Sequence, residues 1–475
     1  MHPTPEQFKR DSGREVHNAT LRGNLKHVTG IIRKLRNDSF AAMEDGEGLR
    51  DIGSAIKQES LARLPELLEQ LEANLTARGI EVHWAETVEE ANQIVLAIAR
   101  RHDVKLVVKG KSMVSEEMEQ NAFLARHGIE AVEADLGEFI VQLAEQTPSH
   151  IIGPAIHLNK EQIATLFHER LGEPYTVNVA EMTAMARRIL REKFKTAGMG
   201  ITGVNFAIAD TGTIALVENE GNGRMCTTVP PVHVALMGIE KVIANVADIP
   251  TMIRLLTRSA TGQQISVYFN WISSPRRPGE KDGPEEVHLV IIDNGRSTVY
   301  ADTELRQTLD CIRCAACLNI CPVYSRIGGH AYEAVYMGPI GKVLTPQMAG
   351  LEIAGHLAGA STLCGACYEV CPVKIPIPNL LLRLRQESNQ PTPAGRAILK
   401  GAGSGRAFSE KMVWKGWQVL NDRPAAYRTL TRLASLAARL VPKQWGPLKE
   451  WTQYRELPQP ARRTLHDLME DRAGQ

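Results

Sequence analysis

The chain has 475 residues, of which 43% are hydrophobic and 23% are charged; this profile is typical of a soluble globular protein with two or three domains. The 55 basic and 54 acidic residues leave a formal net charge of +1, which provides no overall field to attract nucleic acid or an anionic membrane. The polar N-terminus lacks the apolar stretch of a secretory signal, and no run of about 18 apolar residues could span a membrane. We therefore expect a cytoplasmic protein with no nucleic-acid partner and no transmembrane segment.

The beginning of the chain is predicted to be helical. Residues 1–60 are polar, and apolar residues recur at three- and four-residue spacing in the segments 27–43 and 61–79, which is the pattern of amphipathic helices. We assign residues 1–60 to an N-terminal helical segment.

Short apolar runs bounded by polar turns predict strands from about residue 80 onward. Helical segments at 86–102 and 160–171 lie between several of these runs, and strands that alternate with helices of this length indicate an α/β domain with a mostly parallel sheet. We place this domain at residues 61–298, ending just after the proline- and charge-rich loop 273–286. The predicted strands are 81–85, 105–110, 128–134, 150–156, 204–210, 212–219, 241–246 and 287–293.

The cysteines are concentrated in one short stretch. Eight are present, and seven of them fall between Cys311 and Cys371, with only Cys226 elsewhere. In a chain that we expect to be cytoplasmic, cysteines clustered this tightly bind metal rather than form disulfides. We assign residues 299–385 to a metal-binding module.

The first cysteine motif follows C-x2-C-x2-C-x3-C-P without deviation. In two-cluster ferredoxins the first three thiolates of this motif bind one iron–sulfur cubane, and the fourth binds the neighbouring cluster. A zinc site is the alternative, but zinc sites usually pair two C-x2-C elements or use histidines, so the spacing favours iron–sulfur. The four cysteines are Cys311, Cys314, Cys317 and Cys321.

The second motif, which ends in Cys371-Pro372, matches the first with one loss. When the two are aligned on their Cys-Pro ends, Ser361 stands where the first motif has Cys311. The fourth iron of the second cluster must then take a serine alkoxide, water, another side chain or a partner's ligand, or be absent as in a [3Fe–4S] cluster. The crossed pattern predicts two [4Fe–4S] clusters, with Cys311, Cys314, Cys317 and Cys371 on cluster 1 and Cys321, Cys364 and Cys367 on cluster 2.

Two clusters in one module form a path along which electrons enter and leave, so the sequence predicts electron transfer. The motifs are separated by about forty residues, more than in a minimal bacterial ferredoxin, and the intervening segment 347–361 is predicted to be helical. The module therefore resembles the α-helical ferredoxin-like domains of respiratory-type oxidoreductase subunits.

The stretches 321–346 and 361–378, together with the preceding α/β domain, resemble the lactate utilization protein B family over nearly the whole chain. The resemblance implies that the α/β region is a LUD domain related in fold to the CoA-transferase/ribose-phosphate isomerase group. It also implies that three plus four cysteines is a family trait. The function implied is that of the iron–sulfur electron-transfer subunit of a multi-protein system that oxidises L-lactate to pyruvate and allows growth on lactate. The partners implied are cysteine-rich and LUD-type subunits.

Three alternatives stay open at this point. The chain could serve another small-acid oxidoreductase complex, it could itself oxidise a small hydroxy acid in its α/β domain, or its clusters could be purely structural. Against a catalytic α/β domain, the chain lacks an intact nucleotide-binding fingerprint and an obvious acid–base pair, so we name no catalytic residue and expect a non-catalytic or partial role.

Two glycine-containing motifs resemble nucleotide-binding patterns, but one lacks a required glycine and the other has its predicted helix and strand in the wrong order. The stretch Lys109-Gly-Lys111-Ser112 ends like a phosphate-binding loop, but Lys105 occupies the position of the required first glycine, so a strand-to-helix turn is favoured. The segment 198–203 reads G-x-G-x-x-G, but a helix is predicted before it and a strand after it, the reverse of a dinucleotide site. We therefore predict no nicotinamide binding.

Several other features carry weaker expectations. The turns 210–213 and 218–224 flank a strand and could border a pocket, although they also suit ordinary turns. We expect Cys226 to be a partly buried thiol rather than a ligand, and His330 and Tyr332 to pack near the first motif rather than to tune a cluster.

Residues 386–475 are predicted to form a helical tail. Two leucines of its segment 425–441, Leu430 and Leu433, begin an apolar face continued by Leu436 and Leu440, with arginines on another face. Such a helix can lie on an anionic membrane, but amphipathic helices more often pack on a globular core, so docking on this protein or a partner is favoured over peripheral membrane contact. The basic residues between Asp422 and Glu450 are Arg423, Arg428, Arg432, Arg439, Lys443 and Lys449.

Overall fold

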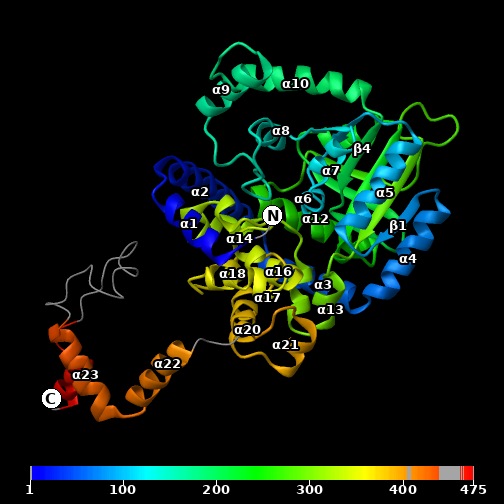
Figure 1. The fold of residues 1–475 in the computed structure, drawn as a ribbon. Helices are drawn as coiled ribbons and strands as arrows, with labels where there is room; N and C mark the ends of the chain where they lie inside the picture. Colours follow the sequence, from blue (N-terminus) through cyan, green and yellow to red (C-terminus); the bar gives the residue numbers. More distant parts are fainter. Residues whose placement is uncertain (1–2, 404–407, 438–460, 462, 464, 474–475) are drawn as a thin grey trace. The chain divides into compact units, whose positions relative to one another are not determined.

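The computed structural model describes residues 3–403, 408–437, 461, 463 and 465–473 (Figure 1). They fall into two compact units, Met1–Gly403 and Ser404–Gln475. Within the described residues, no helix is both long and apolar enough to cross a membrane. The first unit contains the α/β region and the cysteine module.

Four helices open the first unit, in agreement with the helical pattern of the sequence. Polar side chains cap three of them; for example, Asn18 accepts a hydrogen bond from the backbone N–H of Leu21 at the start of α2, which satisfies one of the otherwise free donors of the first turn. The four helices are α1 (Pro5–Val16), α2 (Ala19–Ala41), α3 (Gly46–Ala62) and α4 (Leu64–Ala77).

The main sheet has six strands in the order β1-β10-β7-β4-β2-β3, and every pairing between neighbours is parallel. The prediction of a mostly parallel sheet is therefore confirmed. The strands are β1 (Glu81–Ala85), β2 (Leu106–Lys109), β3 (Glu130–Glu133), β4 (Met199–Gly203), β7 (Val232–Gly238) and β10 (Glu286–Ile292).

Helices bury both faces of this sheet, because alternate residues of a strand point to opposite sides. On β7, Val234 and Leu236 join an apolar cluster with the helices α5 and α7, whereas Ala235 and Met237 join a second cluster with α4. In Figure 1, α5 lies across the sheet, while α9 and α10 lie at the top of the view, above the β4 label. The bounds are α5 (Val88–Arg101), α6 (Met113–Glu117), α7 (Gln120–Arg126), α8 (Leu136–Leu143), α9 (Lys160–Leu171) and α10 (Val179–Thr196).

A second sheet of four strands lies beside the first, in the order β8-β5-β6-β9. Its central pair is antiparallel, with Phe206 opposite Ala215. The remaining elements of this region are β5 (Phe206–Ile208), β6 (Thr213–Glu218), α11 (Asn222–Cys226), β8 (Val242–Ile243), α12 (Ile249–Thr261) and β9 (Tyr268–Ile272).

The strand predicted at 150–156 is wrong. Its apolar letters belong to turns, because the His150 side chain accepts hydrogen bonds from the backbone N–H groups of Ile152 and Gly153 at 3.1 and 3.0 Å. Local side-chain hydrogen bonds of this kind compete with sheet pairing. Three strands were not predicted from the sequence, namely β4, β7 and β9.

The cysteine module consists of short helices, and the helical prediction for 347–361 is confirmed as parts of three of them. Glycines separate these pieces; Gly350, for example, has φ of 101° between α16 and α17, a conformation that favours glycine. The helices of the module and of the segments next to it are α13 (Arg296–Ala301), α14 (Ala316–Ile320), α15 (Tyr324–Ile327), α16 (Gly338–Ala349), α17 (Leu351–Ala354), α18 (His356–Gly359), α19 (Ala366–Glu369), α20 (Ile377–Asn389) and α21 (Pro393–Ile398).

The N-terminal helices pack on this module although they lie some 300 positions away in the sequence. Arg36 donates to the Val370 carbonyl at 2.9 Å, and Arg50 donates to the Cys371 carbonyl at 2.8 Å. Leu25 of α2 belongs to the same buried cluster as Cys314 and Cys317. The opening helices therefore form part of the wall around the cysteines.

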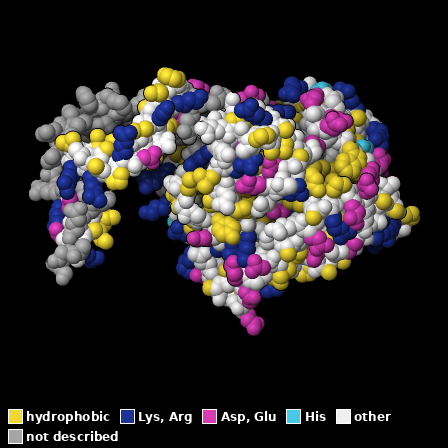
Figure 2. Space-filling view, turned by 90° about the horizontal axis from the view of Figure 1, so that it is seen from below, with side chains coloured by type: hydrophobic (Ala, Val, Ile, Leu, Met, Phe, Trp, Pro, Cys, Tyr) yellow, Lys and Arg dark blue, Asp and Glu magenta, His cyan; other side chains and the backbone are white. Residues whose placement is uncertain are grey.

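The second unit contains the helices α22 (Phe408–Asn421), α23 (Pro424–Ala437) and α25 (Leu465–Ala473). Apolar side chains on them are exposed, including Trp417 and Leu433 at 58% each. Figure 2 shows hydrophobic and basic side chains interspersed on these helices. Arg439, Leu440, Lys443 and Lys449, which extend the predicted basic amphipathic pattern, lie outside the described residues.

Candidate iron–sulfur centre

Backbone conformation bends both cysteine loops in the same way. Arg313 and Ala315, on either side of Cys314, have φ of 61° and 60°. Leu363 and Gly365, on either side of Cys364, have φ of 54° and 84°. Left-handed non-glycine residues are rare and persist only where the surrounding structure fixes them, so both loops hold a particular arrangement of thiols.

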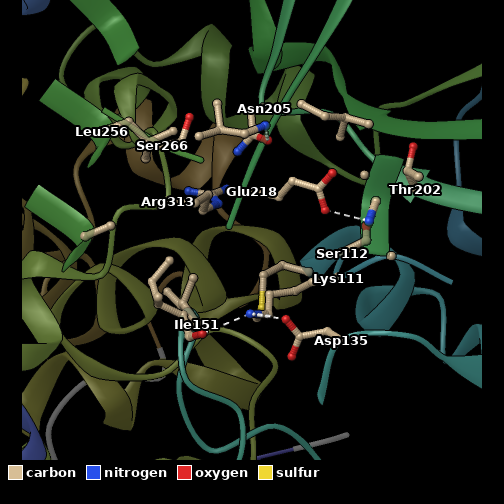
Figure 3. Close-up of a pocket in the computed structure, with 18 of the residues that line it drawn as sticks. Lys111, Ser112, Asp135, Ile151, Thr202, Asn205, Glu218, Leu256, Ser266 and Arg313 are labelled. Carbon is tan, nitrogen blue, oxygen red and sulfur yellow. Dashed lines mark hydrogen bonds and ion pairs between the residues drawn. The ribbon is translucent and has the colours of Figure 1, made fainter. Parts of the chain in front are cut away.

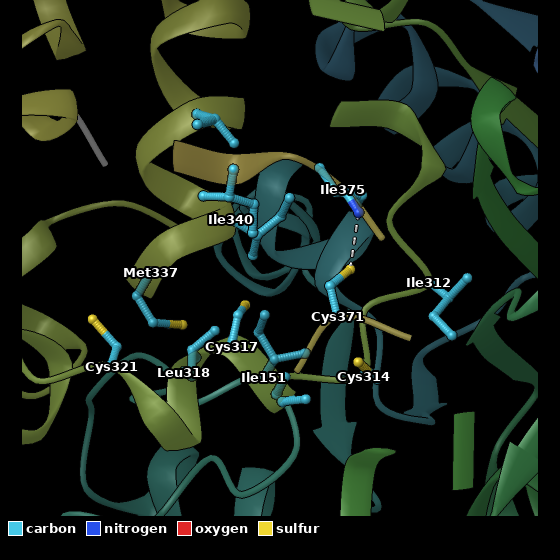
Figure 4. Packing of buried hydrophobic residues seen from close by; sticks show 14 of the residues in the cluster. Ile151, Ile312, Cys314, Cys317, Leu318, Cys321, Met337, Ile340, Cys371 and Ile375 are labelled. Atoms are coloured by element: carbon cyan, nitrogen blue, oxygen red, sulfur yellow. Dashed lines mark hydrogen bonds between the residues drawn. The ribbon is translucent and has the colours of Figure 1, made fainter. Parts of the chain in front are cut away.

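Four thiols from the two motifs line one small hollow. Cys311 precedes the loop, Cys314 lies in it, Cys317 is carried by α14, and Cys371 comes from the second motif. Figure 4 shows Cys314, Cys317 and Cys371 gathered beside Ile340 and Ile375, with Cys321 set apart. The rest of the lining is mostly apolar and includes Ile151, Ile312, Val373 and Ile377.

Burial makes these thiols poor acids in the absence of a metal. Removal from water raises the pKa of Cys371 to about 12, and burial followed by the neighbouring Cys311 and Cys314 raises that of Cys317 well above its usual value. Four free thiols crowded in an apolar site are unfavourable as anions, whereas a bound cationic cluster holds its cysteine ligands as thiolates. The donor set and its surroundings therefore fit an iron–sulfur cluster.

Backbone N–H groups point at three of the sulfur atoms. Arg313 N lies 3.4 Å from Cys311 Sγ, Tyr324 N lies 3.4 Å from Cys321 Sγ, and Ile375 N lies 3.4 Å from Cys371 Sγ. Hydrogen bonds to cluster sulfurs stabilise their negative charge and tune the reduction potential. This pattern is a second reason why the site fits a cluster.

The other three thiols form a separate group nearer the surface. The pKa of Cys367 is raised to about 11 by burial and then by the nearby Cys321 and Cys364, which places the three thiols near one another. Cys364 is exposed, whereas Cys321 is buried. Lys342 Nζ donates to Cys321 Sγ at 3.6 Å, so a positive charge lies beside this group.

Ser361 lies in the second loop as Cys311 lies in the first. The Ser361 Oγ accepts a hydrogen bond from the backbone N–H of Leu363 at 3.2 Å, two residues further on. Cys311 Sγ accepts from Arg313 N, also two residues further on. The hydroxyl oxygen therefore has the same local hydrogen bond as the sulfur that it replaces.

Buried charges link the first loop to the α/β region. Glu240, just after β7, pairs with Arg296 at 2.8 Å and with Arg313 at 3.2 Å. Burial alone would raise the pKa of Glu240, but Arg296 and then Arg313 outweigh it and lower the value to about 2. Lys57 of α3 donates to the Glu240 carbonyl at 2.7 Å. These residues were not predicted, because no sequence spacing relates them.

The stretch 109–112 forms a strand-to-helix turn, as predicted. Lys109 ends β2 and is buried against Glu133 with an Nζ–Oε1 distance of 2.6 Å. Lys111 pairs with Asp135 at 2.8 Å, and Ser112 caps α6. Both lysines of this turn therefore have carboxylate partners.

The segment 198–203 is mostly the buried strand β4, so the rejection of a dinucleotide site is consistent with its context. Gly200 meets a close neighbour there: a Cβ on it would lie 2.0 Å from the Cys226 carbonyl oxygen. The glycine is thus required by packing. Cys226 is fully buried, with its pKa raised first by burial, which makes it more buried than expected.

Of the two turns at the ends of β6, which could border a pocket, only the second does. Asp210 accepts the Val246 N–H at 3.0 Å and does not border the cavity beside the first cysteine loop, whereas Glu218, Glu220 and Gly223 do. This cavity has a volume of about 400 Å³ and lies between the α/β region and the first cysteine loop.

His330 and Tyr332 pack as expected. His330 contacts the Thr147 carbonyl at 2.7 Å. The Tyr332 ring is buried, with Lys342 Nζ 5.4 Å from its centre. Tyr332 thus contacts the lysine that donates to Cys321.

Comparison with known families agrees with these features. Residues 68–292 match the LUD domain, residues 307–375 match the 4Fe-4S dicluster domain, and residues 383–474 match the C-terminal region of lactate utilisation protein B. The chain is therefore a LUD-domain protein with an iron–sulfur dicluster domain.

Curated relatives match over the full length. The lactate utilization protein B of Bacillus licheniformis is 42% identical over 98% of this chain and 97% of that protein. That of Bacillus subtilis is 41% identical over 98% of this chain and 96% of that protein. The chain belongs to the lactate utilization protein B family. A solved DUF162 family protein from Deinococcus radiodurans covers 48% of this chain and 98% of its own length at 14% identity, with a TM-score of 0.28, too low to support a conclusion about the fold.

Proposed function

We propose that the chain is the iron–sulfur electron-transfer subunit of a multi-protein system that oxidises L-lactate to pyruvate. The observation that supports this most directly is the separation of seven cysteines into two neighbouring groups. Cluster 1 would be held by Cys311, Cys314, Cys317 and Cys371, and cluster 2 by Cys321, Cys364 and Cys367.

The chain's own residues would hold the clusters close together and control access to them. Cys317 lies on α14, and Cys321 follows the end of that helix, so one short element carries a ligand of each cluster. When bound, the two [4Fe–4S] clusters supply one-electron carriers. The apolar lining excludes water from the first group, and hydrogen bonds from the loops stabilise sulfur charge.

The difference in solvent exposure between the two groups of thiols suggests where a partner protein docks. The first group is largely buried, with Cys314 and Cys371 each at 7% exposure, whereas Cys364 is exposed. Electron exchange with another protein requires close approach to a cluster, so we propose that a partner docks over cluster 2. We infer that the partners are cysteine-rich and LUD-type subunits of a lactate utilization system, the process for which the curated relatives are named.

A LUD domain related to the CoA-transferase/ribose-phosphate isomerase group is part of the same proposal. An electron-transfer subunit of another small-acid oxidoreductase complex is the alternative, and co-purification separates the two. Recovery of the chain from native cells with lactate-oxidising partner proteins supports the lactate system, whereas partners that oxidise only another acid would refute it.

The electron-transfer role is tested on anaerobically reconstituted full-length protein. Two [4Fe–4S] clusters require about eight iron atoms per chain, and dithionite should reversibly bleach the broad visible absorption. Absorption that dithionite leaves unchanged would make the clusters structural. Purified chain that alone reduces a dye with L-lactate would make it a complete enzyme and contradict the proposal.

A further inference from the structure

The cavity of about 400 Å³ beside the first cysteine loop has no part in the function proposed above. Its walls come from the ends of β4 and β6, from α12 and from the loop that carries Arg313. Figure 3 shows Lys111, Glu218 and Arg313 around this space, reached from three different elements. Distant parts of the sequence thus build one site.

The carboxylates around the cavity already have donors. Glu218 accepts from the backbone N–H groups of Gly223 and Arg224, both at 2.6 Å. Asp135 pairs with Lys111 at 2.8 Å, and Glu220 accepts from the Leu136 N–H at 3.2 Å. The acidic groups therefore do not require a cation to satisfy them.

Two cations in the wall are less well satisfied. Arg313 is 8% exposed, and its Nη1 has no hydrogen-bond acceptor among the described residues, although its Nη2 pairs with Glu240. Lys241 is also 8% exposed, and within the part of the chain that the structure describes its Nζ has neither a hydrogen bond nor an ion pair. Buried polar groups are nearly always paired, and buried charge without a partner is costly.

From these observations we propose that the cavity binds a small organic acid, with its carboxylate between Lys241 and Arg313. A carboxylate accepts hydrogen bonds from both groups and compensates their charge. Leu216 and Leu256 add apolar wall, which suits the carbon chain of an organic acid better than a fully polar anion such as phosphate.

The proposed acid site lies beside the first cysteine loop. Arg313 and Ile151 line both this cavity and the hollow that contains the four thiols. A bound acid would therefore lie next to the loop of cluster 1, separated from the thiols by the side chain of one arginine and one isoleucine. The alternative is that Arg313 and Lys241 only balance the negative charge of cluster 1, in which case no acid binds.

Calorimetric titration of the anaerobically reconstituted full-length protein decides between the two. L-lactate, pyruvate and inorganic phosphate are the probes; the choice of the first two rests on the proposed function. We expect saturable binding of at least one organic acid and weaker binding of phosphate. Absence of binding by both organic acids, or tighter binding of phosphate, would overturn the proposal.

Charge variants test the residues named. Lys241→Met removes a cation, and Asn205→Asp adds a negative charge to the wall while keeping the oxygen that accepts the Val217 N–H at 2.9 Å. Each should weaken binding roughly tenfold or more, as expected for loss of a charge-assisted interaction. The control Lys105→Met removes a lysine whose side chain is 76% exposed, and it should bind like the unaltered protein.

Visible absorption and paramagnetic resonance of each variant show whether both clusters are retained, so that acid binding and electron transfer are tested separately. Variants that retain both clusters but lose acid binding support the cavity site. If Lys241→Met and Asn205→Asp both bind acid as tightly as the control, the site is wrong even though electron transfer stands. Clusters that fail the dithionite test would leave the binding result valid and refute only the electron-transfer role.

Discussion

Ser361 is the residue at which the two cysteine motifs differ, and its geometry makes the difference testable. Its Oγ has the same hydrogen bond to the residue two positions on that Cys311 Sγ has. In the proposed cluster 2 the fourth iron would have no cysteine thiolate, and an iron that lacks a thiolate is lost more readily to oxidants. Cluster 2 should therefore be the less stable of the two clusters in air.

We expect Ser361→Cys to slow the conversion of cluster 2 to a [3Fe–4S] form, because a fourth thiolate would hold the iron that is lost first. Paramagnetic resonance during controlled exposure to air measures this conversion. Thr165→Cys is the control, since it places a thiol at an exposed position of α9, outside both cysteine motifs. Equal rates in Ser361→Cys and the unaltered protein would show that the side chain is directed away from the cluster.

The crossed arrangement of ligands gives a second prediction. Cys371 lines the hollow with Cys311 and Cys314 although it lies about sixty residues further along the chain. Cys371→Ala should therefore remove the signal of cluster 1 and lower the iron content from about eight to about four atoms. Cys321→Ala should instead affect the cluster that contains Cys364. Loss of the same signal in Cys321→Ala and Cys311→Ala would refute this assignment.

Strands differ in how far the sequence reveals them. β1, β2, β3, β6 and β10 were predicted because short apolar runs stand between clear turns. β4 was missed because glycines make up two of its five residues, and glycine weakens any strand pattern. β7 was missed because all seven of its residues are buried, so it has no alternation of polar and apolar letters.

The candidate site was easier to predict in its ligands than in its surroundings. Metal ligands are spaced regularly within short motifs, so the seven cysteines between Cys311 and Cys371 could be predicted as ligands from the sequence. Arg50, Glu240 and Lys241 reach the cysteine module or its cavity from elements 70 to 320 positions away. Only the tertiary fold determines such contacts, so local sequence patterns do not predict them.

Buried histidines in the sheet make stability depend on pH. His233 of β7 is fully buried, and burial followed by the nearby His288 lowers its pKa from 6.5 to about 3. The folded protein thus keeps this ring neutral, whereas the unfolded chain binds a proton below pH 6.5. Stability contributed by the neutral ring is present above that pH and is lost as the pH falls from 6.5 toward 3.

We expect the free energy of unfolding to fall with acid in this window, by up to about 1.4 kcal/mol per pH unit for this one histidine. Urea titrations at several pH values measure the slope. His233→Asn should reduce the slope, and His27→Asn, at an exposed position of α2, should not. An unchanged slope in His233→Asn would show that other groups account for the acid sensitivity.

The chain carries the candidate iron–sulfur centre in its first unit, and its second unit is helical with many exposed apolar side chains. In the second unit, Trp414 and Trp417 stack edge to face with ring centres 5.9 Å apart, and both are exposed. Exposed apolar groups of this size mark interaction surfaces. The tail is therefore the part of the chain best suited to bind a partner protein or a membrane.

Docking on a partner is the outcome we expect. Leu430 and Leu433 of α23 are 47% and 58% exposed, while Arg432 pairs with Asp467 of α25, which reduces the positive charge available to anionic lipid. The intact protein should fail to float with anionic vesicles at low salt, and removal of residues 404–475 should abolish co-purification with partner proteins. The double variant Leu430→Glu, Leu433→Glu should reproduce that loss, whereas Arg423→Gln should not, because apolar contact rather than charge would hold the partner. Flotation of the intact protein, with partner binding retained after the truncation, would establish membrane attachment instead.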